Sequence, residues 1–105
     1  MKTIINTPKA PAPIGPYNQA VLIKDTLFIS GQIPIDPSTG NLVEGDIKAE
    51  TKQSMENLKA ILEEAGMTFN HVVKTSIFIK DMRETVEVAN LPAFVNVEIS
   101  MIAVK

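Results

Sequence analysis

A carboxylate in an apolar strand is the first residue that could do chemistry. Glu98 stands between Val97 and Ile99, in the most apolar part of the chain. Burying a carboxylate there costs several kcal/mol unless hydrogen-bond donors, water or a cation contact it. Two interpretations are open. Either strand polarity simply alternates and Glu98 faces solvent, or Glu98 is a general acid or base with a raised pKa.

An arginine and a tyrosine are the next candidates. Arg83 begins a β-rich run, and its planar guanidinium could hold a substrate carboxylate through two parallel hydrogen bonds, which a lysine cannot match. The alternative is a surface arginine paired with Asp81 or Glu84. Tyr17 follows a rigid Gly-Pro step, so its phenol either points into a cleft or bonds to backbone within the core.

A glycine flanked by polar residues is the third feature. Ser30-Gly31-Gln32 could bring backbone groups close to a ligand, although an edge bulge explains the same residues. A Ser-His-Asp triad at Ser30 or Ser76 is disfavoured, because the single histidine, His71, falls in a loop-like context. With no cysteine in the sequence, thiol nucleophiles, thiolate metal sites and iron–sulfur ligation are excluded.

Length and composition fit one domain spanning residues 1–105. The chain is 45% hydrophobic and 21% charged, which is too apolar for disorder. A net charge of -2 disfavours nucleic acid as a partner, since such a surface normally carries a basic surplus. No apolar run approaches the length of a membrane span, and the N-terminus lacks the apolar stretch of a signal peptide. We therefore expect a cytoplasmic protein with no membrane partner.

The elements that must position these residues follow from hydrophobic periodicity. Alternating or β-rich runs predict strands at residues 3–6, 17–23, 26–32, 72–79, 84–91 and 95–104. The second and third runs flank Lys24-Asp25, which is the spacing of a tight hairpin. Because strands outnumber helices, we expect an α+β fold in which a helix covers one face of a mainly antiparallel sheet.

One amphipathic helix is predicted at residues 46–65, with Asp46 as its N-cap and Gly66 after its last turn. The residues at helical spacing that we expect on its apolar side are Ile47, Thr51, Met55, Leu58, Ile61, Leu62 and Ala65. The carboxylates that we expect on its solvated face are Glu50, Glu56, Glu63 and Glu64.

Several short motifs, in order along nearly the whole chain, resemble the Rid family of reactive imine and enamine deaminases, of the RidA (YjgF-like) type. The matching residues are Ile14-Gly15-Pro16-Tyr17, Phe28-Ile29-Ser30-Gly31-Gln32-Ile33-Pro34, Gln53-Ser54-Met55-Glu56-Asn57-Leu58, Val73-Lys74-Thr75, Arg83 with Val86-Glu87-Val88, and Val97-Glu98-Ile99. Each piece is short, but the combination is specific.

The resemblance implies a chorismate-mutase-like α+β fold assembled as a homotrimer, with active sites in the clefts between subunits. It also implies a 2-iminobutanoate/2-iminopropanoate deaminase. Such an enzyme hydrolyses 2-aminoacrylate and related imines, released by pyridoxal-phosphate enzymes, to 2-keto acids and ammonia without cofactor or metal. These reactions suit the residues present, because an imine carbon is already electrophilic.

The resemblance also assigns roles to the candidate residues. Arg83 would hold the substrate carboxylate, and Glu98 would position or activate the attacking water. Tyr17 and Ser30 would line the pocket. Backbone groups at Gly31 and Thr85 would contact the substrate or orient the water.

The sequence departs from the family between Met82 and Arg83, where the family has about twenty more residues that form a second helix and a loop, a connection long enough for a crossover. Three residues between two strands can close a hairpin but cannot make a parallel crossover. Either the residues are omitted from the sequence or the deletion is genuine. We favour omission, because a deletion would uncover a face of the sheet and force the following strands to re-pair.

Two other functional classes stay open. A binding or chaperone-like module would hold small carboxylates in the same cleft without turnover. Action on RNA has been suggested for members of the resembled family, but the acidic pI of about 5.3 and the lack of interleaved basic and aromatic residues disfavour it.

Intact mass spectrometry of the purified protein separates omission from deletion. We expect a mass above 11.4 kDa by the weight of the second helix and its loop. A measured mass of 11.4 kDa would show that the deletion is genuine and would put both trimer and activity in doubt.

Overall fold

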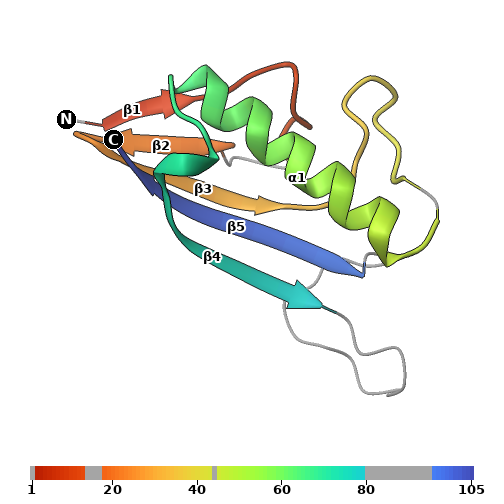
Figure 1. Ribbon diagram of the computed structural model, residues 1–105. Helices are drawn as coiled ribbons and strands as arrows, with labels where there is room; N and C mark the ends of the chain where they lie inside the picture. The colour runs from red at the N-terminus through yellow and green to blue at the C-terminus, as the bar shows by residue number, and fades with distance from the viewer. Residues whose placement is uncertain (1, 14–17, 44, 80–95) are drawn as a thin grey trace.

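The computed structural model describes residues 2–13, 18–43, 45–79 and 96–105. Its elements in chain order are β1 (Lys2–Ile5), β2 (Ala20–Ile23), β3 (Thr26–Gln32), α1 (Ile47–Glu64), the 3-10 turn η1 (Phe69–His71), β4 (Val72–Ile79) and β5 (Val97–Val104). The described strands form one antiparallel sheet in the order β1-β2-β3-β5-β4, and α1 lies across one face of it (Figure 1). The predicted α+β class is confirmed. The strand predicted at residues 84–91 lies outside the described residues.

The β2–β3 hairpin forms where the sequence predicts it. Ile23 pairs with Thr26 across the two-residue turn, and Lys24 takes a left-handed φ of 54° there. A two-residue turn needs such φ values because they match the twist of the two strands. This turn fixes the register of β3, the strand that leads to Ser30 and Gly31.

The helix is capped as predicted. Asp46 is extended, and its side chain accepts a hydrogen bond from the Ala49 amide at 3.0 Å. At the other end Gly66 takes a φ of 74°, a left-handed conformation that glycine adopts without steric cost. Both ends of α1 are therefore set by local chemistry.

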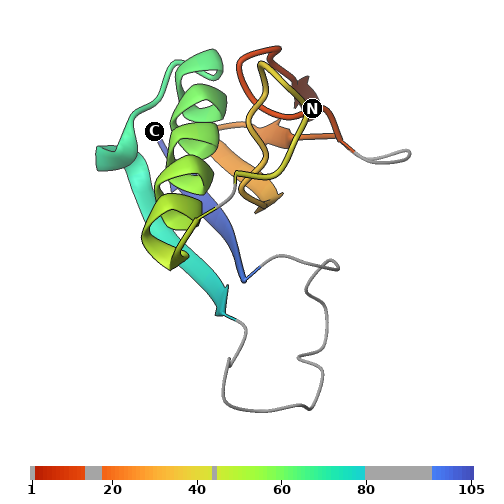
Figure 2. The same ribbon diagram turned by 90° about the vertical axis from the view of Figure 1, so that its right-hand side faces the viewer.

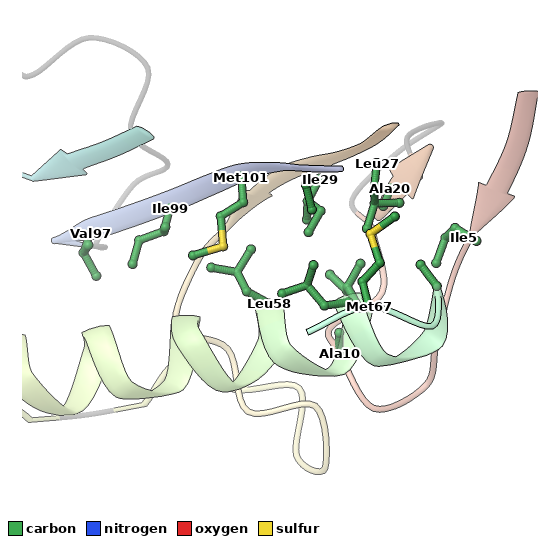
Figure 3. Packing of buried hydrophobic residues seen from close by; sticks show 14 residues of the cluster. Ile5, Ala10, Ala20, Leu27, Ile29, Leu58, Met67, Val97, Ile99 and Met101 are labelled. Carbon is green, nitrogen blue, oxygen red and sulfur yellow. The ribbon is translucent and has the colours of Figure 1, made fainter. Parts of the chain in front are cut away.

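The core lies between α1 and the facing side of the sheet (Figure 3). Along β5, Val97, Ile99, Met101 and Ala103 are buried while the residues between them are not, so the predicted alternation is confirmed. From the helix, Leu58, Ile61 and Leu62 fill the space opposite and are fully buried. Each such side chain contributes about 1.5–3 kcal/mol by leaving water.

The first three turns of α1 differ from the prediction. Their buried residues are polar, namely Glu50, Ser54 and Asn57, while Ile47 is 43% exposed. The expectation that Glu50 faces solvent is wrong. This part of the helix lies over the strand ends and the loop after β3, where backbone groups outside the sheet ladder need hydrogen-bond partners.

The outer strand β4 leaves apolar side chains uncovered on the helix side. Ile77 pairs with Ile99 and Ile79 with Val97, so all four share one face of the sheet. Ile77 and Ile79 are nevertheless 55% and 58% exposed. Helix α1 lies over β3 and β5, and among the described residues no second helix extends the cover to β4 (Figures 1 and 2).

The helix that the structure describes is not apolar enough to cross a bilayer.

Replacing Leu58 by alanine tests the packing between helix and sheet. The side chain is fully buried, so we expect Leu58→Ala to lower the free energy of unfolding by about 2–5 kcal/mol through lost transfer energy and the cavity left behind. Urea denaturation measures this. The exposed neighbour Lys59 provides the control: Lys59→Ala should change stability by no more than about 0.5 kcal/mol, and equal effects of the two variants would contradict the assigned core.

Candidate active site

A cavity of about 230 Å³ opens at the end of the sheet where β3 finishes and β5 begins. Its lining comes from the proline-rich segment that contains Pro8, Pro11 and Pro13, the two residues before β2, the end of β3, the loop after β3, and β5. The lining residues are Pro11, Ala12, Pro13, Asn18, Gln19, Ser30, Gly31, Gln32, Ile33, Ile35 and Glu98. Three of the residues predicted for the site, Ser30, Gly31 and Glu98, are thus brought together from segments far apart in the sequence.

Gly31 and Glu98 are in direct contact. A Cβ built on Gly31 would lie 2.6 Å from both Cδ and Oε1 of Glu98, closer than real Cβ atoms approach. Only glycine therefore lets the Glu98 carboxyl lie this close to the β3 backbone. The bulge that the sequence offered as one explanation is present, whereas a close approach of Gly31 to a ligand stays a prediction.

The bulge is visible in the register of β3 and β5. Ile29 pairs with Met101 and Gln32 with Ile99, so β3 advances three residues while β5 advances two. A bulge of this kind leaves a residue outside the ladder and re-aims its neighbours. Here it turns Ser30 and Gly31 toward the cavity instead of continuing the sheet.

Both the amide and the hydroxyl of Ser30 donate hydrogen bonds to backbone carbonyls. Its amide donates to the Gln19 carbonyl and its Oγ donates to the Asn18 carbonyl, each at 3.0 Å. A ligand can therefore meet the Ser30 oxygen as an acceptor, while the hydroxyl proton holds the hairpin. This favours a lining role over a nucleophilic one.

Glu98 faces away from the helix, as strand alternation predicts, and yet it also lines the cavity. The two sequence interpretations are therefore not exclusive. The side chain is half-buried, and loss of hydration raises the pKa of the Glu98 carboxyl above its usual value. A carboxyl with a raised pKa, next to a cavity, can accept or return a proton near neutral pH more readily than an exposed one.

Gln19 is a structural residue of the site that sequence reasoning missed. Its buried amide accepts from the Thr7 amide and donates to the carbonyls of Thr7, Ala10 and Pro11 at 2.9, 3.2 and 2.8 Å. These bonds hold the proline-rich segment as one wall of the cavity. One signal was present: prolines deny that segment its own backbone donors, so a polar side chain from elsewhere must bind its carbonyls.

Arg83, Tyr17 and Thr85 lie outside the described residues, so their predicted roles stay predictions. Within the described ranges no three His, Cys, Asp or Glu side chains gather in the way that a metal site needs.

A protein-family model described as Endoribonuclease L-PSP matches residues 7–85, most of the chain. The chain belongs to this family, the YjgF/RidA family. Among its relatives, a RutC family protein of Pyrococcus abyssi is 46% identical over 99% of this chain and 98% of its own length. The mouse 2-iminobutanoate/2-iminopropanoate deaminase is 42% identical over 100% of this chain and 93% of its own length.

Solved structures of the YjgF/RidA family share the fold. A Rid-family protein of Yersinia pestis matches with a TM-score of 0.91 and 40% identity over 100% of both chains. TdcF of E. coli, solved with bound serine, matches with a TM-score of 0.88 and 35% identity over 98% of both chains.

The relatives are longer than this chain inside the matched region. The match to the mouse protein spans 125 positions although this chain has 105 residues, so at least 20 positions of that relative have no counterpart here. This agrees in size with the segment of about twenty residues that is expected between Met82 and Arg83.

Gly31→Ala tests the contact between Gly31 and Glu98. The added methyl would displace the Glu98 carboxyl toward water, so we expect the pKa of Glu98 to fall toward its ordinary value. The measurement is a carbon-13 NMR titration of the Glu98 side-chain carboxyl in both proteins.

Gly40→Ala is the matched control. Its added Cβ meets no atom within 4 Å, but the φ of 76° strains it, so it should lower stability and leave the Glu98 titration in place. An unchanged Glu98 titration in Gly31→Ala would contradict the close approach.

Proposed function

We propose that this protein hydrolyses reactive enamine and imine intermediates of the 2-aminoacrylate type, released by pyridoxal-phosphate enzymes, to 2-keto acids and ammonia. The observation that carries the proposal is the half-buried Glu98 carboxyl, with its raised pKa, lying against Gly31 in a small cavity. The name of the mouse relative supports the reaction class. The serine bound to TdcF supports a small amino-acid-like substrate.

The reaction needs one base and one water. The enamine first tautomerises to the imine, which is electrophilic at carbon. Glu98 takes a proton from the water, whose oxygen bonds to that carbon, and the protonated Glu98 returns this proton to the nitrogen, which gives a neutral carbinolamine. Glu98 then takes the carbinolamine hydroxyl proton and passes it to the nitrogen as the C–N bond breaks, so the carbonyl forms, ammonia leaves and one water is consumed for each ammonia released. Holding water and imine together in the cavity supplies much of the rate acceleration.

Five other residues complete the proposed site. Arg83 binds the substrate carboxylate through its guanidinium fork. Tyr17 and Ser30 line the pocket, and backbone groups of Gly31 and Thr85 contact the substrate or orient the water. The acceptor role left to the Ser30 oxygen supports its part in this arrangement.

The proposed assembly is a homotrimer with a chorismate-mutase-like fold. Support comes from the sheet face opposite α1, where apolar side chains on all five described strands are exposed. These residues are Ile4, Ile23, Phe28, Phe78 and Val104. Exposed apolar area spread over a whole sheet face is typical of a subunit interface, and Glu98 lies on this same face opposite Phe78.

A second candidate is a trimeric module that binds small carboxylates without turnover. It is favoured by one observation, the at least 20 positions of the mouse relative that have no counterpart in this chain. If residues of that segment complete the site, this chain can retain the cavity and lose the reaction.

Ammonia and keto-acid release in a serine or threonine dehydratase reaction tests the proposal. Adding the purified protein should speed conversion of the imine. Arg83→Ala should abolish turnover with the oligomer unchanged by light scattering. Glu98→Gln keeps the size of the side chain but removes the base, so it should lower kcat/KM by about 10² to 10⁴.

The pH dependence of kcat/KM tests whether Glu98 acts as the base. The ionised carboxylate is the active form, so kcat/KM should rise with pH through an apparent pKa that loss of hydration raises above the ordinary value of a glutamate carboxyl. Undiminished ammonia release by Arg83→Ala would refute the deaminase. Saturable 2-keto-acid binding without any turnover would identify the binding module instead.

A further inference from the structure

The polar side chains buried on α1 have no role in the proposed reaction. Glu50, Ser54 and Asn57 follow one another at helical spacing on a single face and are 5%, 0% and 1% exposed. Apolar residues would fill this space at lower cost, since a buried carboxylate loses its hydration.

Glu50 holds the start of β5. Its Oε1 accepts from the Asn96 amide at 3.1 Å, and its Oε2 accepts from Asn96 Nδ2 at 2.6 Å. Asn96 stands two residues before Glu98, directly ahead of the strand that carries it. Both oxygens of one buried carboxylate thus fix the entry of the chain into β5.

Asn57 holds the loop that follows β3. Its Nδ2 donates to the carbonyls of Ile33 and Ile35 at 3.2 and 3.0 Å, and its Oδ1 accepts from Gln53 Nε2 at 2.9 Å. Ile33 and Ile35 both line the cavity. The amide therefore fixes the wall that continues from the Gly31 bulge.

We propose that Glu50 and Asn57 are positioning residues, and that α1 acts as a rigid spacer between the two halves of the site. One half is Glu98 on β5, and the other is the Gly31 bulge with the loop after it. The two anchors are seven positions apart on the helix, a span of roughly 10 Å along its axis. A helix keeps such a span constant, whereas the loop after β3 and the entry to β5 need these bonds to stay in place. The kinetic part of this inference rests on the proposed function.

Ser54 supplies a matched control on the same face. It is fully buried, and its Oγ has no hydrogen-bond partner among the described residues. Ser54→Ala therefore removes a buried polar atom from the same helix face without releasing either half of the site.

The test compares Glu50→Ala, Asn57→Ala and Ser54→Ala with the unmodified protein, well below the unfolding temperature of each. We expect Glu50→Ala and Asn57→Ala to lower kcat/KM about ten- to a hundredfold, the loss that follows when a catalytic group moves by roughly an ångström. Glu50→Ala should act mainly on kcat, because it releases the strand that carries Glu98. Asn57→Ala should act mainly on KM, because it releases the cavity wall. Ser54→Ala should keep the original values.

A carbon-13 titration of the Glu98 carboxyl gives a readout independent of turnover. Glu50→Ala should shift the pKa of the Glu98 carboxyl, and Ser54→Ala should leave it unchanged. Glu50→Gln should restore most of the original behaviour, because its amide can still accept from the Asn96 backbone and pair with the Asn96 side chain. If Glu50→Ala does not fold, Asn96→Ala removes one of the two bonds from the other side and should move the titration in the same direction.

The outcomes separate the two proposals. Unmodified protein without turnover counts against the deaminase, and the Glu98 titration then still decides the positioning role. Folded Glu50→Ala and Asn57→Ala proteins with unchanged kcat/KM and an unchanged Glu98 titration would overturn the inference. Equal losses in Ser54→Ala would overturn it too, since they would reflect general weakening of the helix.

Discussion

The antiparallel pairing of β3 with β5 is the interaction on which the site depends. It joins Thr26–Gln32 to Val97–Val104, segments at opposite ends of the chain, and it buries one face of both strands against α1. The same pairing contains the bulge that places Gly31 under the Glu98 carboxyl. Core and candidate site are therefore two faces of one strand pair, and a shift of register by one residue would exchange them.

Around this pair, buried amides and one carboxylate hold segments that have no regular hydrogen bonding of their own. Gln19 binds the proline-rich segment, and Asn57 binds the loop after β3. Glu50 binds the residue that precedes β5. Such polar side chains add little net stability, but they set positions that apolar packing leaves loose. On α1, Glu50 and Asn57 bind segments beside the cavity, whereas Leu58, Ile61 and Leu62 fill the core.

The edge strand β4 is less well covered than the rest of the sheet. Its helix-side residues Ile77 and Ile79 are exposed although they pair with buried residues of β5. The mouse relative has at least 20 positions without a counterpart in this chain, which agrees with the expectation of a second helix between Met82 and Arg83. The opposite face carries a second exposed apolar surface, which the proposed homotrimer would bury.

The sequence by itself determined the class of fold, the bounds of the helix, the hairpin and the alternation of β5, because each depends on local periodicity, capping and turn chemistry. It also selected Glu98, Ser30 and Gly31, through residue type and through resemblance to a family. The sequence led us to expect Glu50 on the solvated face of the helix and gave no role to Gln19. A polar residue on a helix or beside a strand is expected to face solvent as long as its hydrogen-bond partner is unknown. Whether Glu98 faced solvent or a site could only be decided in three dimensions. The answer depends on contacts across more than sixty residues of chain, which no local pattern records.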